Sequence, residues 1–250
     1  MCTLALYYQS FDGYPLVVAA NRDEHYDRPA APPGLLDGKP AILAGRDLRA
    51  GGTWLGVNEH GLLAGILNRR ADGDPRPNAR SRGLLCLDIL ARKSAAQARA
   101  FAQAHRADYQ PFTLLAVDEN EAWSGYNTAD DIEVNPLGPG LHVFSNTGES
   151  DATSDKRDRA YGRFAALAVE LQKSLATDGC LRLQSVLNDH SLGDGSNDPR
   201  DAICMHGENS GTVSSSIILY AQRERCFRGY YCPGAPCRNN FGPMTEFAVR

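Results

Sequence analysis

The chain has 250 residues, of which 42% are hydrophobic and 22% are charged, as in an ordinary globular protein with a sizeable core. This composition excludes wholesale disorder, a collagen-like fibre and a coiled coil. The formal net charge of −4 argues against a nucleic-acid partner, because domains that bind nucleic acid are usually basic.

A β-hairpin is predicted at the start of the chain. Residues 3–8 are rich in β-formers, Asp12-Gly13 is a strong turn dipeptide, and residues 14–20 form a second apolar run. A two-residue loop places Cys2 opposite Asp23, whereas a one-residue bulge places it opposite Arg22. Either register brings Cys2 beside the polar segment that follows the second run.

Further strands and helices alternate along the chain, and residues 27–50, rich in Pro, Gly and charge, are predicted to form a long loop. The predicted strands cover residues 53–57, 62–67, 112–117, 122–126, 141–145, 212–220, 226–231 and 245–249, and the predicted helices cover 83–106, 156–175 and 181–188. Residues 191–201 are expected to form a polar loop. This order predicts a single α+β domain over residues 1–250, with helices packed on antiparallel sheets.

The cysteines and the hydropathy favour a cytoplasmic protein without a membrane span. No apolar run approaches the roughly 18 residues that cross a bilayer. The first residues show no basic segment and too short an apolar stretch for a signal peptide. The seven cysteines are odd in number, so a reducing compartment is expected rather than a disulfide framework.

Cys2 is the first candidate for chemistry. Initiator-methionine removal is expected to expose it as the first residue. A terminal cysteine then carries a thiol nucleophile and an α-amine base, whose reference pKa values of about 8.5 and about 7.7–8.0 allow proton exchange near neutral pH. The alternative interpretation is a thiol that simply packs in a strand, which is the usual fate of a cysteine without a disulfide.

Polar residues at strand ends complete the candidate site. Arg22 is expected to lower the pKa of the thiol or to hold a substrate carboxylate, and Asp23 to orient the α-amine. Asn68 and Asn146 each end a predicted strand, where a side-chain amide donates to a developing oxyanion. The alternatives are a solvated strand end for the charged residues and turn caps for the asparagines.

Weaker signals lie elsewhere. Cys226, Cys232 and Cys237 are spaced more widely than usual zinc ligands, so we expect no metal there. The run Cys204-Met205-His206 contains soft ligands, and His206 is a weaker candidate for a haem or metal ligand. Residues 69–82 carry five arginines and two aspartates, which suits either an anionic substrate or an exposed loop.

Several segments together identify a family resemblance. The chain resembles the NRDE family, which includes the transport and Golgi organisation 2 proteins, in the opening Met-Cys, Ala19-Ala20-Asn21-Arg22-Asp23-Glu24 with Tyr26 and Arg28-Pro29, Gly51-Gly52-Thr53-Trp54-Leu55-Gly56, Asn58-Glu59-His60-Gly61, Leu67-Asn68, Phe144-Ser145-Asn146 and Gly211-Thr212-Val213-Ser214-Ser215-Ser216. This resemblance implies a four-layer αββα sandwich of the Ntn-hydrolase type.

The pattern is more distantly similar to the choloylglycine hydrolase and penicillin V acylase group. By that resemblance Cys2 matches the nucleophile, Arg22 the arginine, and Asn68 and Asn146 the two asparagines. Two departures stand out. The acylases place their aspartate three residues after the arginine, whereas Asp23 is adjacent to it. Their late arginine has no clear counterpart here, and Lys156 or Arg157 is the candidate replacement.

Two functions are therefore expected as alternatives. The first is an amidohydrolase for a small linear amide, with Asn21, Glu24 and Trp54 contacting the substrate and with no cofactor or metal. The second, which the resemblance implies, is a non-catalytic protein that binds or transports haem or a lipid-like metabolite. The partner is a small molecule in both cases, and the sequence leaves the oligomeric state open.

Overall fold

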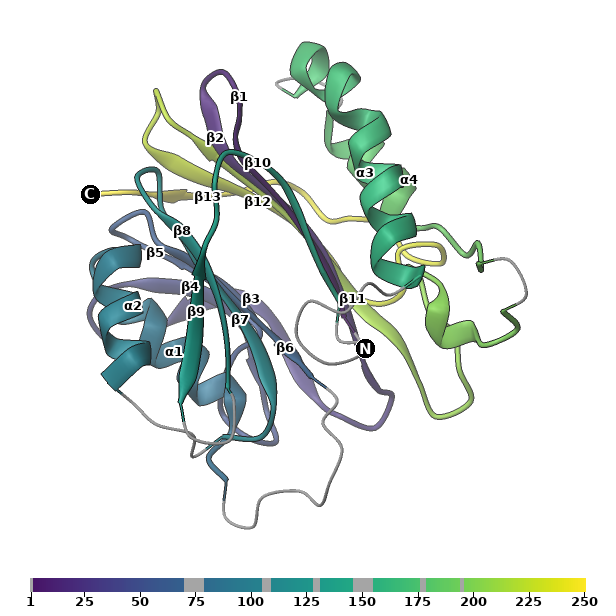
Figure 1. Ribbon diagram of the computed structural model, residues 1–250, viewed down its shortest axis with the longest axis horizontal. Helices are drawn as coiled ribbons and strands as arrows, with labels where there is room; N and C mark the ends of the chain where they lie inside the picture. The colour runs from purple at the N-terminus through teal and green to yellow at the C-terminus, as the bar shows by residue number, and fades with distance from the viewer. Residues whose placement is uncertain are drawn as a thin grey trace.

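The computed structural model describes residues 2–69, 79–104, 109–127, 131–145, 155–175, 179–193 and 196–250. In this part of the chain, two antiparallel sheets lie face to face, and a pair of helices covers the outer face of each sheet (Figure 1). The arrangement confirms the predicted α+β class and the αββα sandwich. No helix in the described ranges is long and apolar enough to cross a membrane.

Cys2 directly precedes the strand that lies second in the first sheet, counted from one edge to the other. Its strands run in the order β10 (Gly140–Ser145), β1 (Thr3–Phe11), β2 (Tyr14–His25), β11 (Ser210–Ala221), β12 (Cys226–Cys232) and β13 (Thr245–Ala248). Helices α3 (Asp155–Ser174) and α4 (Gly179–Leu187) pack on its outer face. A short 3₁₀ helix, η1 (Pro199–Asp201), precedes β11.

The second sheet follows chain order from edge to edge. Its strands are β3 (Ala30–Leu36), β4 (Ile42–Asp47), β5 (Leu55–Asn58), β6 (Leu63–Asn68), β7 (Phe112–Val117), β8 (Ala122–Asn127) and β9 (Ile132–Pro136). Helices α1 (Arg82–Leu90) and α2 (Ala95–Ala104) cover its outer face. Neighbouring strands in this order are joined by consecutive stretches of chain, so the sheet is a meander with α1 and α2 inserted between β6 and β7.

Strand β1 shows why the sandwich has separate hydrophobic layers. Successive side chains of a strand point to opposite faces. Leu4 and Leu6 therefore pack in the core between the sheets, whereas Ala5 and Tyr7 pack in the core beneath α3 and α4. Because both faces of β1 are covered, it is an almost continuous apolar run rather than an alternating one.

The register of the first hairpin decides what lies beside Cys2. Phe11 pairs with Tyr14 across the turn, but Thr3 pairs with Asn21, so the register shifts by one residue within the hairpin. Gln9 has a φ of 48°, which marks the bulge. The bulged alternative is thus the one observed, and continuing the register places Cys2 opposite Arg22.

Two of the predicted elements differ from the structure, and one strand was missed. The expected loop over 27–50 contains β3 and β4. Pro32 and Pro33 suggested a loop, but β3 is an edge strand, where proline is tolerated. The single helix predicted over 83–106 is two helices, because the Ser94 hydroxyl accepts the Gln97 N–H at 3.2 Å and starts α2 anew. Strand β9 was not predicted.

Candidate active site

Cys2 lies in a cleft of about 410 Å³ at one end of the sandwich. The cleft is bordered by the end of β2, the segment before β5, the end of β6 and the start of α1. The Cys2 side chain is half-buried, and its Sγ lies 3.9 Å from the backbone oxygen of Asp23. The thiol is therefore held against β2 and still borders an open space.

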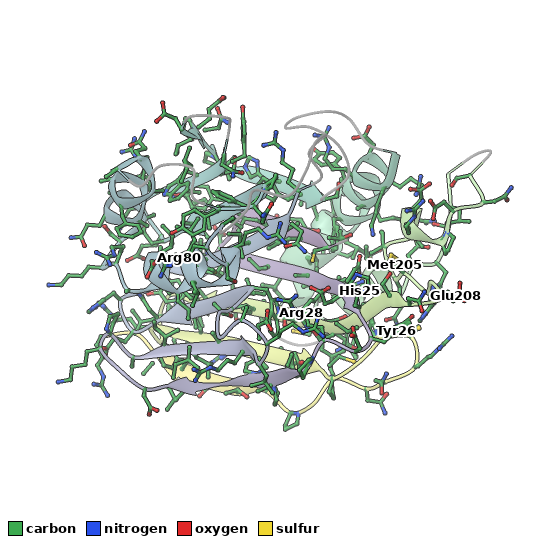
Figure 2. All side chains as sticks on the ribbon, turned by 90° about the horizontal axis from the view of Figure 1, so that it is seen from below. His25, Tyr26, Arg28, Arg80, Met205 and Glu208 are labelled. Carbon is green, nitrogen blue, oxygen red and sulfur yellow. The ribbon has the colours of Figure 1, made fainter. Side chains whose placement is uncertain are left out.

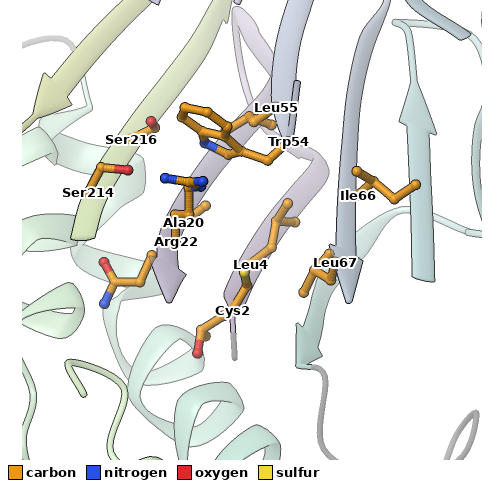
Figure 3. Close-up of a pocket in the computed structure, with 12 residues that line it drawn as sticks. Cys2, Leu4, Ala20, Arg22, Trp54, Leu55, Ile66, Leu67, Ser214 and Ser216 are labelled. Atoms are coloured by element: carbon orange, nitrogen blue, oxygen red, sulfur yellow. The ribbon is translucent and has the colours of Figure 1, made fainter. Parts of the chain in front are cut away.

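Arg22 turns toward the second sheet. Its guanidinium carbon lies 4.2 Å from the centre of the Trp54 ring, within the range of a cation–π contact, and Figure 3 shows the two side chains facing each other. Beneath them a small apolar pocket of about 20 Å³, room for roughly one water, is bordered by Leu4, Leu67 and Cys2. Trp54 thus fixes the direction of the Arg22 side chain at the cleft.

Asp23 is held from two distant parts of the chain. Its Oδ2 lies 3.1 Å from Lys156 Nζ, and its Oδ1 accepts a hydrogen bond of 2.7 Å from the Thr212 hydroxyl. Both members of the Lys156–Asp23 ion pair have completely buried side chains. A buried carboxylate needs such partners, because an unpaired charge in the interior is very costly.

The Cys2 thiol has a perturbed acidity. Burial raises its pKa above the ordinary 9.0, and the neighbouring Asp23 charge acts in the same direction. The Arg22 guanidinium acts in the opposite direction and lowers the pKa. Burial thus favours the neutral thiol of Cys2 over the thiolate.

Asn21 is engaged by the protein itself. Its amide nitrogen donates to the backbone oxygens of Leu187 and Ile203 at 2.8 and 2.9 Å, and its oxygen accepts from Ser215 at 2.5 Å. The side chain is almost completely buried. Both amide hydrogens are used, so Asn21 holds β2 against the segments around α4 and η1 and has no donor left for a ligand.

Several arginines line the cleft, but their charges are not equally compensated. Arg28 binds Asp47 through two hydrogen bonds of 3.0 and 2.5 Å, and Arg80 pairs with Asp88. Within the described residues, Arg22 and Arg82 have no carboxylate at ion-pair distance. Burial lowers the pKa of Arg82, although it remains far above neutral pH for an arginine. This leaves a positive region in the cleft.

The structure gathers most of the predicted site residues. Cys2, Arg22, Asp23, Glu24, Trp54 and Asn68 all line the cleft. The Glu24 carboxylate accepts the His25 N–H at 3.0 Å and lies 3.8 Å from Arg28. Asn21 lines the small apolar pocket instead, and Asn146 lies outside the described residues.

Some residues of the site were not singled out by sequence. Thr212 belongs to a segment quoted for the family resemblance, and Arg82 belongs to the arginine-rich stretch, but no local pattern distinguished either. Lys156 was one of two candidates for a late cation. The structure places Lys156 on Asp23, whereas Arg157 pairs with Asp158 at the surface.

Comparison with known proteins gives a consistent family. A family model described as Transport and Golgi organisation 2 matches residues 1–227. The Transport and Golgi organization protein 2 homolog of Bos taurus is 30% identical over 236 residues, which cover 84% of this chain and 83% of the bovine protein. The Transport and Golgi organization 2 homolog of Mus musculus is 31% identical over 147 residues, 55% of this chain and 52% of that protein.

Solved structures of low sequence identity share the fold. The C2A mutant of conjugated bile acid hydrolase from Clostridium perfringens aligns with a TM-score of 0.61 at 12% identity, covering 99% of this chain and 92% of that one. Penicillin V acylase from Agrobacterium tumefaciens aligns with a TM-score of 0.57 at 13% identity, covering 93% and 83%. These proteins have Ntn-hydrolase folds, which confirms the fold that the resemblance implied.

Proposed function

Because the chain belongs to the transport and Golgi organisation 2 family and has an Ntn-hydrolase fold, we propose that it is an N-terminal-cysteine amidohydrolase for a small linear amide. The position of Cys2 carries the proposal. Its thiol borders a cleft of about 410 Å³ that Arg22, Asp23 and Asn68 also line. A nucleophile, a cation, an acid group and an amide donor thus converge on one space, as acyl transfer requires.

Acylation begins after Met1 has been removed. The α-amine of Cys2 takes the thiol proton, and Sγ attacks the carbonyl carbon of the substrate. Negative charge moves to the carbonyl oxygen, where the Asn68 side-chain amide donates a hydrogen bond. Collapse of this intermediate breaks the C–N bond, and the ammonium returns its proton to the leaving amine. Asn146 is the proposed second donor.

Deacylation repeats these steps with water. The α-amine of Cys2 takes a proton from water, and the resulting hydroxide equivalent attacks the thioester carbon. The C–S bond then breaks, the thiolate leaves and recovers a proton, and a carboxylic acid is released. A cysteine thiol has a reference pKa of about 8.5, so it is mostly protonated at neutral pH and the adjacent amine is needed as its base.

Arg22 and Asp23 have supporting roles in the proposal. The Arg22 guanidinium, held by Trp54, stabilises negative charge on Sγ. Asp23 lies next to Arg22 in the chain, and Lys156 and Thr212 hold its carboxylate in place. In this scheme, the negative charge of Asp23 keeps the α-amine of Cys2 in position at the start of β1.

The charges of the cleft favour an anionic substrate. Arg28 and Arg80 are compensated by Asp47 and Asp88, but Arg82 has no carboxylate at ion-pair distance within the described residues. A guanidinium in a partly desolvated cleft binds a carboxylate or phosphate through paired hydrogen bonds. The proposed substrate is therefore an amide that carries an anionic group, such as an N-acyl amino acid.

The test combines mass spectrometry with an amidase screen. Untagged protein is weighed intact before and after a limiting dose of a thiol-reactive acylating probe, and a panel of N-acyl amino acids is assayed for amine release. We expect loss of the methionine mass, labelling of Cys2 ahead of the other cysteines, and hydrolysis that falls by at least about 10³-fold in Cys2→Ala. Cys226→Ala, a substitution at a buried cysteine on β12, should keep full activity.

The binding alternative gives different results. Three results together contradict the amidohydrolase proposal. Met1 is retained, the probe labels Cys2 no faster than the other cysteines, and ligand binding is unchanged in Cys2→Ala. Haem and a lipid-like metabolite are the candidate cargoes under this alternative. Absence of a Soret shift when haem is titrated into the protein counts against haem as the cargo.

A further inference from the structure

Away from the cleft, two histidines and two cysteines bring their ligand atoms together. His190 follows α4, Cys204 and His206 precede β11, and Cys237 follows β12. The four ligand atoms all lie within 4.8 Å of one another. We refer to His190, Cys204, His206 and Cys237 as the thiol–imidazole cluster.

The distances in this cluster suit a tetrahedral metal ion. Zinc–sulfur bonds of about 2.3 Å and zinc–nitrogen bonds of about 2.0–2.1 Å imply sulfur–sulfur edges of about 3.8 Å and sulfur–nitrogen edges of about 3.6 Å. The Sγ atoms of Cys204 and Cys237 are 3.7 Å apart. Nε2 of His206 lies 3.9 and 3.1 Å from these two sulfurs, so the observed edges bracket the tetrahedral value.

The orientation of His190 supports the same geometry. Its Nδ1 lies 3.0 Å from the backbone oxygen of Cys204, and its ring stacks on that of His206 at 5.1 Å. A histidine that binds a metal through one nitrogen usually donates the other N–H to a carbonyl or carboxylate. When Nδ1–H donates to this carbonyl, Nε2 keeps its lone pair for a metal.

We propose that the thiol–imidazole cluster binds one structural Zn²⁺ ion. Two thiols release their protons and bind as thiolates, and two neutral imidazoles bind through nitrogen. The complex is then electrically neutral, and two protons enter the solvent. Sulfur and imidazole ligands favour zinc over magnesium or calcium, which prefer oxygen. Four protein ligands leave no position for water, which is typical of a structural rather than a catalytic zinc site.

The sequence indicated only part of this site: it offered the soft ligands of Cys204 and His206, with His206 as a weaker candidate for a haem or metal ligand, but not their partners His190 and Cys237. The three cysteines considered together, Cys226, Cys232 and Cys237, do not converge, because Cys226 and Cys232 lie at opposite ends of β12, about 20 Å apart at the rise of a strand. Cys237 instead meets Cys204 and His206, more than 30 positions earlier in the chain. Our expectation of no metal at Cys226, Cys232 and Cys237 rested on their local spacing alone.

The proposed ion would brace the segment that orients Asp23. Met205, between two of the ligands, donates its N–H at 2.9 Å to the Thr212 hydroxyl, which donates in turn to Asp23. The Tyr26 hydroxyl donates to the backbone oxygen of Gly207 at 3.2 Å, and Figure 2 shows Tyr26 beside Met205 and Glu208. Zinc would thus tie the chain after β12 to the loop that holds the end of β2.

Metal content is the direct test. Untagged protein, purified under reducing conditions, is analysed for zinc by mass spectrometry, and stripped protein is titrated with Zn²⁺ and with Co²⁺. We expect one zinc per chain, a rise in the melting temperature on zinc addition, and the visible and thiolate charge-transfer bands of tetrahedral Co²⁺. Cys237→Ser and His206→Gln should each lose most of the bound metal.

The controls separate a site from general thiol binding. Cys226→Ser keeps a full equivalent of zinc if the cluster alone binds the ion, and far-ultraviolet circular dichroism verifies that Cys237→Ser is folded. Failure of the reduced, stripped protein to take up one equivalent of zinc overturns the proposal. Zinc binding that survives Cys204→Ser and His206→Gln also overturns it. The same holds for a Cys204–Cys237 disulfide that persists under reducing conditions in place of bound zinc.

Discussion

Lys156 Nζ lies 3.1 Å from Asp23 Oδ2, and both side chains are completely buried. The pair joins the start of α3 to the end of β2, directly behind the cleft that contains Cys2. A buried pair of this kind adds little net stability compared with an apolar pair, but the loss of one partner leaves an uncompensated charge. The pair therefore makes the position of Asp23 depend on α3.

Removal of the lysine should be costly for folding. Lys156→Met is expected to lower the free energy of unfolding by about 3–5 kcal/mol, because the Asp23 carboxylate stays buried without its cation. Urea denaturation measures the change. Arg163→Met, which removes an exposed partner of Asp189 from the same helix, should cost less than about 1 kcal/mol. Equal losses in the two variants would contradict a special role for the buried pair.

The Arg28–Asp47 pair at the cleft should make stability depend on acid pH. Burial raises the pKa of Asp47, but hydrogen bonds from Arg28 and from the backbone N–H groups of Arg49 and Ala50 outweigh it and hold the pKa below 3.8. A carboxylate with a lowered pKa stabilises the fold above its unfolded pKa, and this contribution disappears as the pH falls through the folded pKa.

The prediction for this pair compares Asp47→Asn with the wild type between pH 7 and pH 2. Asp47→Asn should be less stable by about 1–3 kcal/mol at pH 7, and the difference should vanish below the folded pKa. Asp27→Asn is the control, because the exposed Asp27 carboxylate pairs with Arg49 at the surface and should contribute less than about 1 kcal/mol. A difference that stays constant with pH would show that charge is not its cause.

A close backbone approach holds the cleft wall together. A Cβ at Gly52 would lie 2.2 Å from the carbonyl carbon of Gly83, whereas nothing lies within 4 Å of a Cβ at Gly162. Gly52→Ala should lower the free energy of unfolding by about 1–3 kcal/mol, because two backbone segments must separate. Gly162→Ala, on α3, should raise it by about 0.5–1 kcal/mol through helix propensity. Thermal unfolding of both variants checks the opposite signs.

Two asparagines near Cys2 should behave differently when replaced. Asn68 lines the cleft, whereas the amide of the buried Asn21 binds Leu187 and Ile203. If Asn68 stabilises the oxyanion, Asn68→Ala should lower kcat by about 10²–10³-fold with little change in stability.

Asn21→Ala should instead destabilise the fold by about 1–3 kcal/mol, because the partners of its amide remain buried and unsatisfied. Chemical denaturation and steady-state kinetics on both variants separate the two roles. A large loss of stability in Asn68→Ala with an unchanged kcat would remove Asn68 from the proposed mechanism.

Local patterns predicted much of the fold. The alternating and apolar runs identified the hairpins around Asp12-Gly13 and residues 58–61, and the helical pattern after residue 155 identified α3. Errors arose where a local signal had a second interpretation. Proline at 32 and 33 indicated a loop, but an edge strand also accepts it, and edge positions are defined only by the assembled sheet.

The sequence by itself determined that Cys2 and Arg22 are neighbours, because a tight turn leaves few registers for the two strands that flank it. Only the tertiary structure decided what surrounds Asp23. Its partners Lys156 and Thr212 lie 133 and 189 residues away, brought close by the packing of α3 and the pairing of β2 with β11. A strand's pattern specifies which face is buried, but not which distant strand pairs with it. The choice of that partner depends on the whole core.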